Sequence, residues 1–235
     1  RWTMLPDLAF LDLETTGLDP ARHEIIEAAV IRVDGRTLAA LESVNVRIAP
    51  LHIETAEPDA LRVNGYAPAT WGGGSLEVAL LEVAPLLVGA TLSGQNVARF
   101  DLPFLEAGFR AVDLAMPRSK YVLDVASLCW PLYQRGLVES LSLSALCDYY
   151  GVSNVGAHGA LADARRALQV ARRVLGMGPP CHCQFEIGDR PCPRHGDTEC
   201  PSCGTVYLAS AGHECPTTSP QVAVVRFAKP QGGAA

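Results

Sequence analysis

The sequence predicts an α/β protein, in which a mixed β-sheet flanked by helices precedes a small module rich in cysteine and histidine. Three strand-like segments come first, and alternating helical and strand-like segments follow, which is typical of a mixed sheet with helices on its faces. Six of the eight cysteines fall between Cys181 and Cys215. We therefore expect a first domain over residues 1–176, a linker at 177–180, a Cys/His module over 181–216 and a tail over 217–235 with a flexible end.

The expected strands are short apolar segments bounded by turn residues. The first ends at Thr15-Thr16-Gly17, and Asp34-Gly35 indicates a hairpin between the second and third, with a loop longer than two residues. The strands are expected at Leu8–Leu13, Ile25–Val33, Leu41–Ile48 and near Ala90–Gln95. Helices are expected at Ser75–Leu87, from Phe100–Asp101 onward, and at Val125–Arg135, Ser142–Tyr150 and Ala160–Leu175.

Composition restricts the possible functions. The net charge of −6 does not indicate a broad basic face for long duplex nucleic acid, so short or single-stranded substrates fit better. No stretch approaches the roughly 18 apolar residues of a membrane span, and we expect no membrane partner. The first residues lack the basic start and apolar run of a secretory signal. We therefore expect a cytoplasmic protein.

Three polar motifs carry the expected chemistry, and the first is an acidic pair. Asp12 and Glu14 lie two residues apart at the end of the first strand, so both carboxylates point to one face. Two anions beside an apolar strand repel each other and lose hydration, which a divalent cation would offset. The alternative is a pair of solvated carboxylates at a frayed strand end, which is the commoner origin of an isolated pair.

The second and third motifs each place an aspartate in the first turn of a helix. Asp101 follows the fourth strand and the polar turn at Gln95-Asn96, and Asp163 follows a glycine-flanked His158. A helix N-terminus favours aspartate without any function, and a loop histidine is usually solvated. An imidazole of near-neutral pKa beside a carboxylate is, however, what a general base requires. Their joint occurrence in this order favours a functional site.

These motifs resemble those of the DnaQ-like DEDDh 3′–5′ exonucleases, a family that includes the proofreading epsilon subunit of bacterial DNA polymerase III. The resemblance covers roughly residues 8–175. It is strongest in the motif Leu11-Asp12-Leu13-Glu14-Thr15-Thr16-Gly17-Leu18 and in the segment from Ser140 to Ala164. It implies a ribonuclease H-like fold and two Mg²⁺ or Mn²⁺ ions. Asp12, Glu14, Asp101 and Asp163 would be the metal ligands, and His158 the base. Gln95 departs from the histidine that many members have, which leaves its role open.

The resemblance also implies a substrate site. Thr15, Thr16 and Gly17 could hold the terminal sugar, Leu18 could pack on the last base, and Asn96 could hydrogen-bond the substrate. A strand-to-loop turn capped by threonines is the alternative for the first three. Arg165 and Arg166 could contact phosphate but are preferred as a solvated helix face, and Asp124 is preferred as a helix cap over a ligand.

The Cys/His module is expected to bind zinc. It holds four pairs at chelating spacing, which suffice for two tetrahedral sites, with His182 as a further candidate. Sequential pairing of these ligands is preferred over cross-braced pairing because it closes shorter loops. A single zinc with spare thiols is an alternative to two sites. Disulfides are less favoured than either. Zinc would supply much of the folding free energy of so short a segment. The expected ligands are Cys181, Cys183, Cys192, His195, Cys200, Cys203, His213 and Cys215.

The sequence therefore predicts a metal-dependent 3′–5′ exonuclease that releases nucleoside 5′-monophosphates from the 3′ ends of nucleic acid. Single-stranded DNA is favoured weakly over RNA. Two alternatives stay open: an RNA-trimming exoribonuclease, and a module that docks on a DNA polymerase or another replication or repair protein.

Overall fold

The computed structural model describes residues 5–154, 158–176, 197–199 and 206–208. Within these ranges it contains a five-stranded sheet in the order β3-β2-β1-β4-β5. The central strand β1 is antiparallel to β2 and parallel to β4, β2 is antiparallel to β3, and β4 is parallel to β5. The expected mixed sheet is confirmed. The strands are β1 (Leu8–Thr15), β2 (Ile25–Val33), β3 (Ala40–Arg47), β4 (Thr91–Gly94) and β5 (Val122–Asp124).

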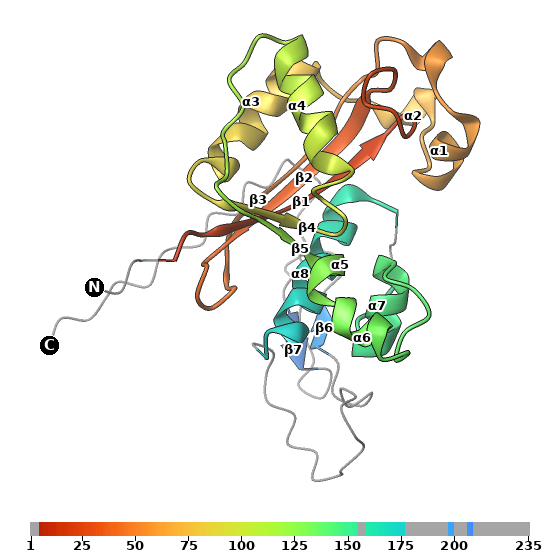
Figure 1. Ribbon diagram of the computed structural model, residues 1–235. Helices are drawn as coiled ribbons and strands as arrows, with labels where there is room; N and C mark the ends of the chain where they lie inside the picture. Colours follow the sequence, from red (N-terminus) through yellow and green to blue (C-terminus); the bar gives the residue numbers. More distant parts are fainter. Residues whose placement is uncertain (1–4, 155–157, 177–196, 200–205, 209–235) are drawn as a thin grey trace, which may run out of the picture.

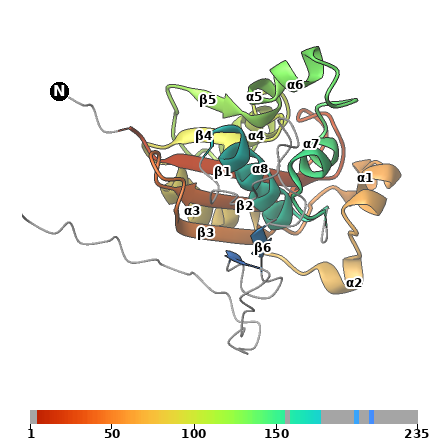
Figure 2. The same ribbon diagram turned by 90° about the horizontal axis from the view of Figure 1, so that it is seen from below.

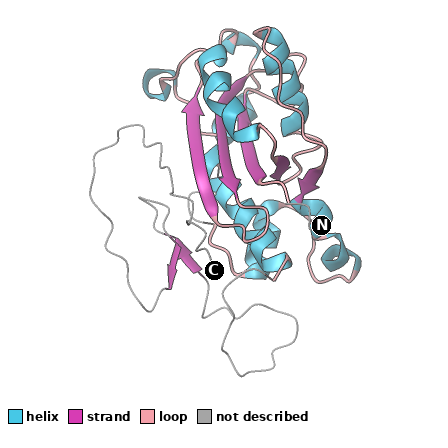
Figure 3. Ribbon diagram, turned by 90° about the vertical axis from the view of Figure 1, so that its left-hand side faces the viewer, coloured by secondary structure: helices cyan, strands magenta, loops and turns pink. Residues whose placement is uncertain are grey.

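Helices cover both faces of this sheet. In Figure 1, α3 and α4 lie on one side of the strands, and α8 lies on the other side with α5, α6 and α7. Figure 3 shows the strands side by side with helices around them. The described helices are α1 (Pro58–Val63), α2 (Pro68–Trp71), α3 (Leu76–Leu87), α4 (Asp101–Ala111), α5 (Val125–Leu128), α6 (Trp130–Gln134), α7 (Leu143–Tyr150) and α8 (Ala160–Val174), with a 3₁₀ turn at Ile53–Thr55.

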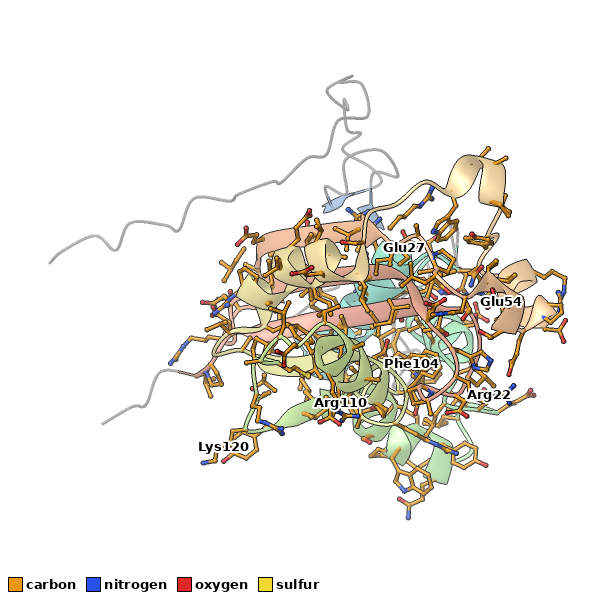
Figure 4. The ribbon with its side chains drawn as sticks, turned by 90° about the horizontal axis from the view of Figure 1, so that it is seen from above. Arg22, Glu27, Glu54, Phe104, Arg110 and Lys120 are labelled. Carbon is orange, nitrogen blue, oxygen red and sulfur yellow. The ribbon has the colours of Figure 1, made fainter. Side chains whose placement is uncertain are left out.

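The alternation of side chains along β1 builds two cores. Leu11 and Leu13 point toward α3 and α4, where they pack with apolar side chains that include Phe104. Phe104 comes from α4 and is labelled in Figure 4. Phe10 points the other way and packs against α7 and α8. Asp12 and Glu14 share the face of Phe10, because side chains two residues apart on a strand point the same way. Their carboxylates therefore lie on the α8 side of the sheet.

The structure adds elements that the sequence pattern does not predict. Strand β5 has only three residues. The short helices α1 and α2 lie in the segment that connects β3 to α3. The single helix expected at Val125–Arg135 is instead two, α5 and α6, which meet at Cys129. Pro131 explains this break, because proline cannot donate the backbone hydrogen bond that would continue α5.

The hairpin between β2 and β3 has a loop longer than two residues, as expected. Asp34 closes it by accepting backbone hydrogen bonds at Oδ1 from Arg36 (3.0 Å) and Thr37 (2.8 Å). Leu38 adopts a φ of 55° there, and its side chain is buried. The Asp34 hydrogen bonds lower the pKa of this carboxyl below its usual range.

The expected linker, 177–180, the tail, 217–235, and all eight expected zinc ligands lie outside the described residues. In this part of the chain the structure describes only β6 (Asp197–Glu199) and β7 (Val206–Leu208), which pair antiparallel. None of the helices that the structure describes is long and apolar enough to cross a membrane.

Candidate active site

The acidic pair lies on the central strand of the sheet. Asp12 is aligned with Ala29 of β2, and Glu14 is aligned with Glu27. The register of β1 and β2 shifts between Glu14 and Thr15, directly after the pair. Strand β2 pairs with β1 at both acids, whereas β4 pairs with β1 only at Leu8–Phe10, so the two carboxylates project from a strand that β2 holds in register.

Asp163 joins the pair from helix α8, which crosses the strands β1 and β2 (Figure 2). One carboxylate oxygen from each of Asp12, Glu14 and Asp163 lies within 4.8 Å of the other two. This brings together three of the four metal ligands that the resemblance implies, although about 150 residues separate them in sequence. The spacing of the oxygens matches a site in which one hard cation is shared by several carboxylates.

Asp101 completes the acidic set from the start of α4. Its side chain is 1% exposed, and its Oδ1 accepts a hydrogen bond from the backbone N–H of Leu13 (2.9 Å). Leu13 lies between Asp12 and Glu14, so this hydrogen bond fixes Asp101 to the acidic strand. Asp101 is not part of the three-carboxylate cluster, but its charge acts on Asp12.

The pKa values of three of these acids are raised by burial and by the negative charges of their neighbours. Loss of hydration raises the pKa of Asp12 well above its usual range, and the charges of Asp101, Asp163 and Glu14 raise it further, against the opposing charge of Arg166. Burial raises the pKa of Glu14 to about 7, with Asp163 and Glu27 adding to the effect. Burial also raises the pKa of Asp101, although the hydrogen bond from Leu13 opposes this. Divalent cations would relieve all three shifts.

His158 lies on the N-terminal side of α8, two residues before the helix begins at Ala160. Its side chain is exposed, and its φ of 71° places the backbone in the left-handed region that non-glycine residues rarely adopt. A backbone held in this region at a candidate site is consistent with a functional constraint. The role of His158 as a base stays a prediction.

The burial of Arg166 differs from the expectation that its side chain lies on a solvated helix face. The sequence favoured a solvated arginine, but the residue is 6% exposed. It forms an ion pair of 2.5 Å with Oδ1 of Asp163, three residues earlier on the same helix. The sequence pattern could not show this, because the side chain is buried by segments distant from it in sequence. Arg165, its neighbour, is partly exposed.

The loop after Glu14 is held by internal hydrogen bonds. The Thr15 hydroxyl donates to the Gly17 carbonyl (2.7 Å), and the Thr16 hydroxyl accepts from the Glu24 backbone N–H (2.9 Å). Both threonines are buried. Their hydroxyls therefore shape the turn, which is the alternative that the sequence left open, while contact with a substrate stays a prediction. Leu18 follows and is 72% exposed.

His23 supports this loop and was missed by sequence reasoning. A Cβ atom at Gly17 would approach the His23 ring to 2.6 Å, so the ring packs directly on the glycine. His23 Nδ1 accepts a hydrogen bond from the Asp19 backbone N–H (3.0 Å). The segment that connects β3 to α3 also supports the loop after Glu14, because Asn64 donates a hydrogen bond to the Thr15 carbonyl (3.1 Å). No local pattern indicates either contact.

The turn after β4 places the remaining candidates. Asn96 is exposed and has a φ of 56°, which asparagine tolerates better than most residues. Gln95 donates a hydrogen bond from Nε2 to the Leu141 carbonyl (2.6 Å), and this contact ties the turn to the segment before α7. Asp124 caps α5 by accepting from the Ser127 N–H (3.3 Å), and the preferred interpretation as a helix cap is confirmed.

Glu27 is a further acid at the site that the sequence did not single out. It is labelled in Figure 4, lies directly across from Glu14 in the sheet, and accepts a hydrogen bond from Asn45 Nδ2 (3.0 Å). Its position becomes evident only once the register of β1 and β2 is known. A buried acid at this position adds negative charge on the face that carries the cluster.

This sheet, with acids from β1, α4 and α8 converging at one end, defines the nuclease class of the ribonuclease H-like fold. The chain belongs to the exonuclease family: the family model RNase_T, described as Exonuclease, matches residues 9–171. The DnaQ-like assignment made from the sequence motifs is confirmed.

Known proteins support this family and the fold. The chain is 26% identical over 176 residues to protein NEN2 of Arabidopsis thaliana (71% of this chain, 34% of NEN2). It is 28% identical over 167 residues to the PolC-type DNA polymerase III of Thermotoga maritima (71% and 12%). Escherichia coli Exonuclease I in complex with a dT13 oligonucleotide has a TM-score of 0.64 at 21% identity, covering 72% of this chain and 41% of that chain. The chain thus spans about a third or less of the length of these two curated relatives.

Proposed function

We propose that this exonuclease hydrolyses phosphodiester bonds from the 3′ end of single-stranded DNA and releases nucleoside 5′-monophosphates. The observation that carries the proposal is the convergence of Asp12, Glu14 and Asp163 within 4.8 Å, with Asp101 fixed beside them through Leu13. Carboxylate oxygens in this number are suited to Mg²⁺ or Mn²⁺ and not to a soft metal.

The four acids would hold two divalent ions. Bound there, such ions would activate a water molecule and stabilise the departing 3′ oxygen of the cleaved phosphodiester. The protein supplies the ligands on rigid elements, β1, α4 and α8, so their relative positions do not depend on a loop. The four negative charges would equal the four positive charges of two divalent ions, and the raised pKa values of Asp12, Glu14 and Asp101 agree with such a need for positive charge.

His158 would accept the proton of the attacking water. Two observations support this role: its side chain is exposed, and it lies two residues before the helix that carries Asp163. Substitution of this residue should reduce turnover while leaving the metal ligands in place.

The substrate would meet the loop after Glu14. Leu18 offers an exposed apolar surface for the terminal base, and the turn formed by Thr15, Thr16 and Gly17 would lie against the terminal sugar. Asn96, exposed on the turn before α4, would add a hydrogen bond. The net charge of −6 favours a single strand over a long duplex, and DNA is supported by the similar fold of E. coli Exonuclease I, whose structure is a complex with a dT13 oligonucleotide.

The test is a 5′-labelled oligonucleotide incubated with the full chain and Mg²⁺ or Mn²⁺. We expect a stepwise ladder of shorter products, nucleoside 5′-monophosphates in solution, and no ladder with Asp12→Asn. Asp59→Asn, at an exposed acid of α1, is the matched control and should retain activity. If matched single- and double-stranded DNA and RNA all stay intact with either metal, the proposal is wrong. Preferential RNA shortening would favour the exoribonuclease alternative.

The docking alternative has support in the likeness to PolC-type DNA polymerase III, in which a similar segment belongs to a polymerase chain. His158→Ala separates the two, because it should lower the rate of hydrolysis by roughly 100-fold or more and leave binding to a polymerase unchanged. A biological activity that survives His158→Ala would favour docking.

For the Cys/His module we propose one or two structural Zn²⁺ ions. The four Cys/His pairs at chelating spacing support this, since they suffice for two tetrahedral sites. Elemental analysis of the purified full chain should find one or two zinc ions per chain. Cys200→Ser should lower that number by one, whereas a metal-free chain with intact thiols would contradict the proposal.

A further inference from the structure

Arg166 is a buried cation at the edge of the acidic cluster. It lies on α8 three residues after Asp163, and its side chain is almost fully shielded from water. Burying a guanidinium is costly unless its charge and its N–H groups are matched by acceptors. The residues that match it therefore indicate what the arginine holds in place.

The guanidinium has acceptors on two different segments. Nη2 donates to Oδ1 of Asp163 (2.5 Å), and Nη1 donates to Oδ1 of Asn154 (2.6 Å), which precedes α8 in the chain. The Asn154 amide in turn donates to Oδ1 of Asp148 on α7 (2.8 Å). Arg166 thus joins a metal-ligand candidate to the connection between α7 and α8.

Asn154 is itself held by α7, because its amide also donates to Asp148. The planar guanidinium can donate along two directions at once, whereas an ammonium group has no such fixed fork. One oxygen of Asp163 accepts from Arg166, and the carboxylate keeps further lone pairs for a cation. Both partners would therefore be oriented by one rigid group.

We propose that Arg166 is a positioning residue, which fixes the carboxylate of Asp163 and ties it through Asn154 to Asp148 on α7. The inference rests on the proposed function, because it assigns Asp163 to the metal. Arg166 acts through Asp163, and its own side chain is buried.

The test measures Mn²⁺ binding by calorimetry on the full chain, alongside kcat and KM for a single-stranded oligonucleotide. Asp12→Asn provides the reference for binding outside the acidic site. Arg166→Gln removes the charge and the fork, Arg166→Lys keeps the charge alone, and Asn154→Ala removes only the second acceptor. Arg62→Gln is the matched control, because Arg62 forms an exposed ion pair with Asp59 at the same three-residue spacing (3.1 Å).

Both Arg166 variants should weaken Mn²⁺ binding at the acidic site by roughly tenfold or more and lower kcat, with KM changed less than about twofold. Asn154→Ala should weaken Mn²⁺ binding and lower kcat less than Arg166→Gln does, because the contact between Arg166 and Asp163 remains. The Asn154→Ala/Arg166→Gln double variant should be no worse than Arg166→Gln, because both changes interrupt one network. Arg62→Gln should match the unaltered chain in every measurement.

Three results would overturn the inference: full rescue by Arg166→Lys, unchanged Mn²⁺ binding in a folded Arg166→Gln, or additive effects in the double variant. A fall in thermal stability alone, with metal binding and kcat retained, would also overturn it, because it would show a structural role only. If the unaltered chain lacks nuclease activity but the variants still differ in Mn²⁺ binding, the proposed function fails while the positioning of Asp163 stands.

Discussion

The backbone N–H of Leu13 donates a hydrogen bond of 2.9 Å to Oδ1 of Asp101, a residue 88 positions further along the chain. Leu13 separates the two acids of β1, and Asp101 begins α4. This contact therefore fixes the second acidic motif to the first. It also gives Asp101 two separable roles, one as a hydrogen-bond acceptor and one as a charge.

Substitution of Asp101 can separate these roles. Asp101→Asn keeps an oxygen for the Leu13 N–H and removes a charge that is costly to bury, so the metal-free variant should unfold at a temperature equal to or above that of the unaltered chain. Hydrolysis should nevertheless be lost. Asp101→Ala leaves the Leu13 N–H without its partner and should be less stable than Asp101→Asn by about 1–3 kcal/mol. Thermal unfolding with chelator checks both, and equal stability of the two variants would contradict the structural role.

The acidity of Glu14 predicts a pH dependence of stability. Burial raises the pKa of Glu14 from 4.5 to about 7 in the metal-free fold, so the folded state holds its proton more tightly than the unfolded chain does. The stability contributed by that proton is fully present below about pH 4.5 and is lost as the pH rises through about 7. The free energy of unfolding of the metal-free chain should therefore fall over this range more steeply than that of Glu14→Gln.

The same proton competes with metal. Mn²⁺ binding should tighten as the pH rises from about 6 to 8, because Glu14 must lose its proton to bind a cation. Calorimetric titrations at several pH values, in buffers of different ionisation enthalpy, would also detect the released proton. A Mn²⁺ affinity that does not change across this range would show that Glu14 is not a ligand.

Gly17 tests the loop that follows the acidic pair. A methyl group at this position would lie 2.6 Å from the His23 ring, so Gly17→Ala must displace the ring or the loop. We expect kcat/KM to fall roughly tenfold to 100-fold, because the terminal sugar would be misplaced, while Mn²⁺ binding stays within about twofold. Gly74→Ala is the control, since its methyl group meets no atom within 4 Å. Activity equal to the control would exclude a role for this loop.

Leu18 tests the apolar contact with the terminal base. Because the side chain is exposed, Leu18→Ala should change the free energy of unfolding by less than about 0.5 kcal/mol. Loss of apolar contact should instead raise KM for a short oligonucleotide by roughly tenfold. Leu51→Ala, at a residue that is 81% exposed, provides the comparison. A KM that is the same in both variants would remove Leu18 from the substrate site.

The sequence predicted those parts of the fold that have a strong local pattern. The first three strands and the helices α3, α4, α7 and α8 are apolar segments with clear periodicity and capping or turn residues, and the structure confirms them. Strand β5 escaped prediction because three residues carry no period, and it forms by pairing with β4. The helices α1 and α2 are also too short for a recognisable pattern.

The site shows the same division. Asp12 and Glu14 could be predicted because strand geometry alone puts them on one face, and Asp163 because its motif precedes a long helix. Their approach to within 4.8 Å depends on how α8 packs on β1, which the sequence supports only through the resemblance. The burial of Arg166, the His23 ring against Gly17 and the position of Glu27 arise from contacts between distant segments. Local patterns therefore could not predict them.

Strand β1 pairs with β2 from Leu8 to Thr15 and with β4 at Leu8–Phe10, and it carries two of the acids. Removing the ions would alter the charge balance without removing any of the backbone pairing that supports those side chains. Inactivation by a chelator should consequently be reversible, with cleavage returning when Mg²⁺ or Mn²⁺ is added back, since the scaffold would survive each cycle of depletion and reloading.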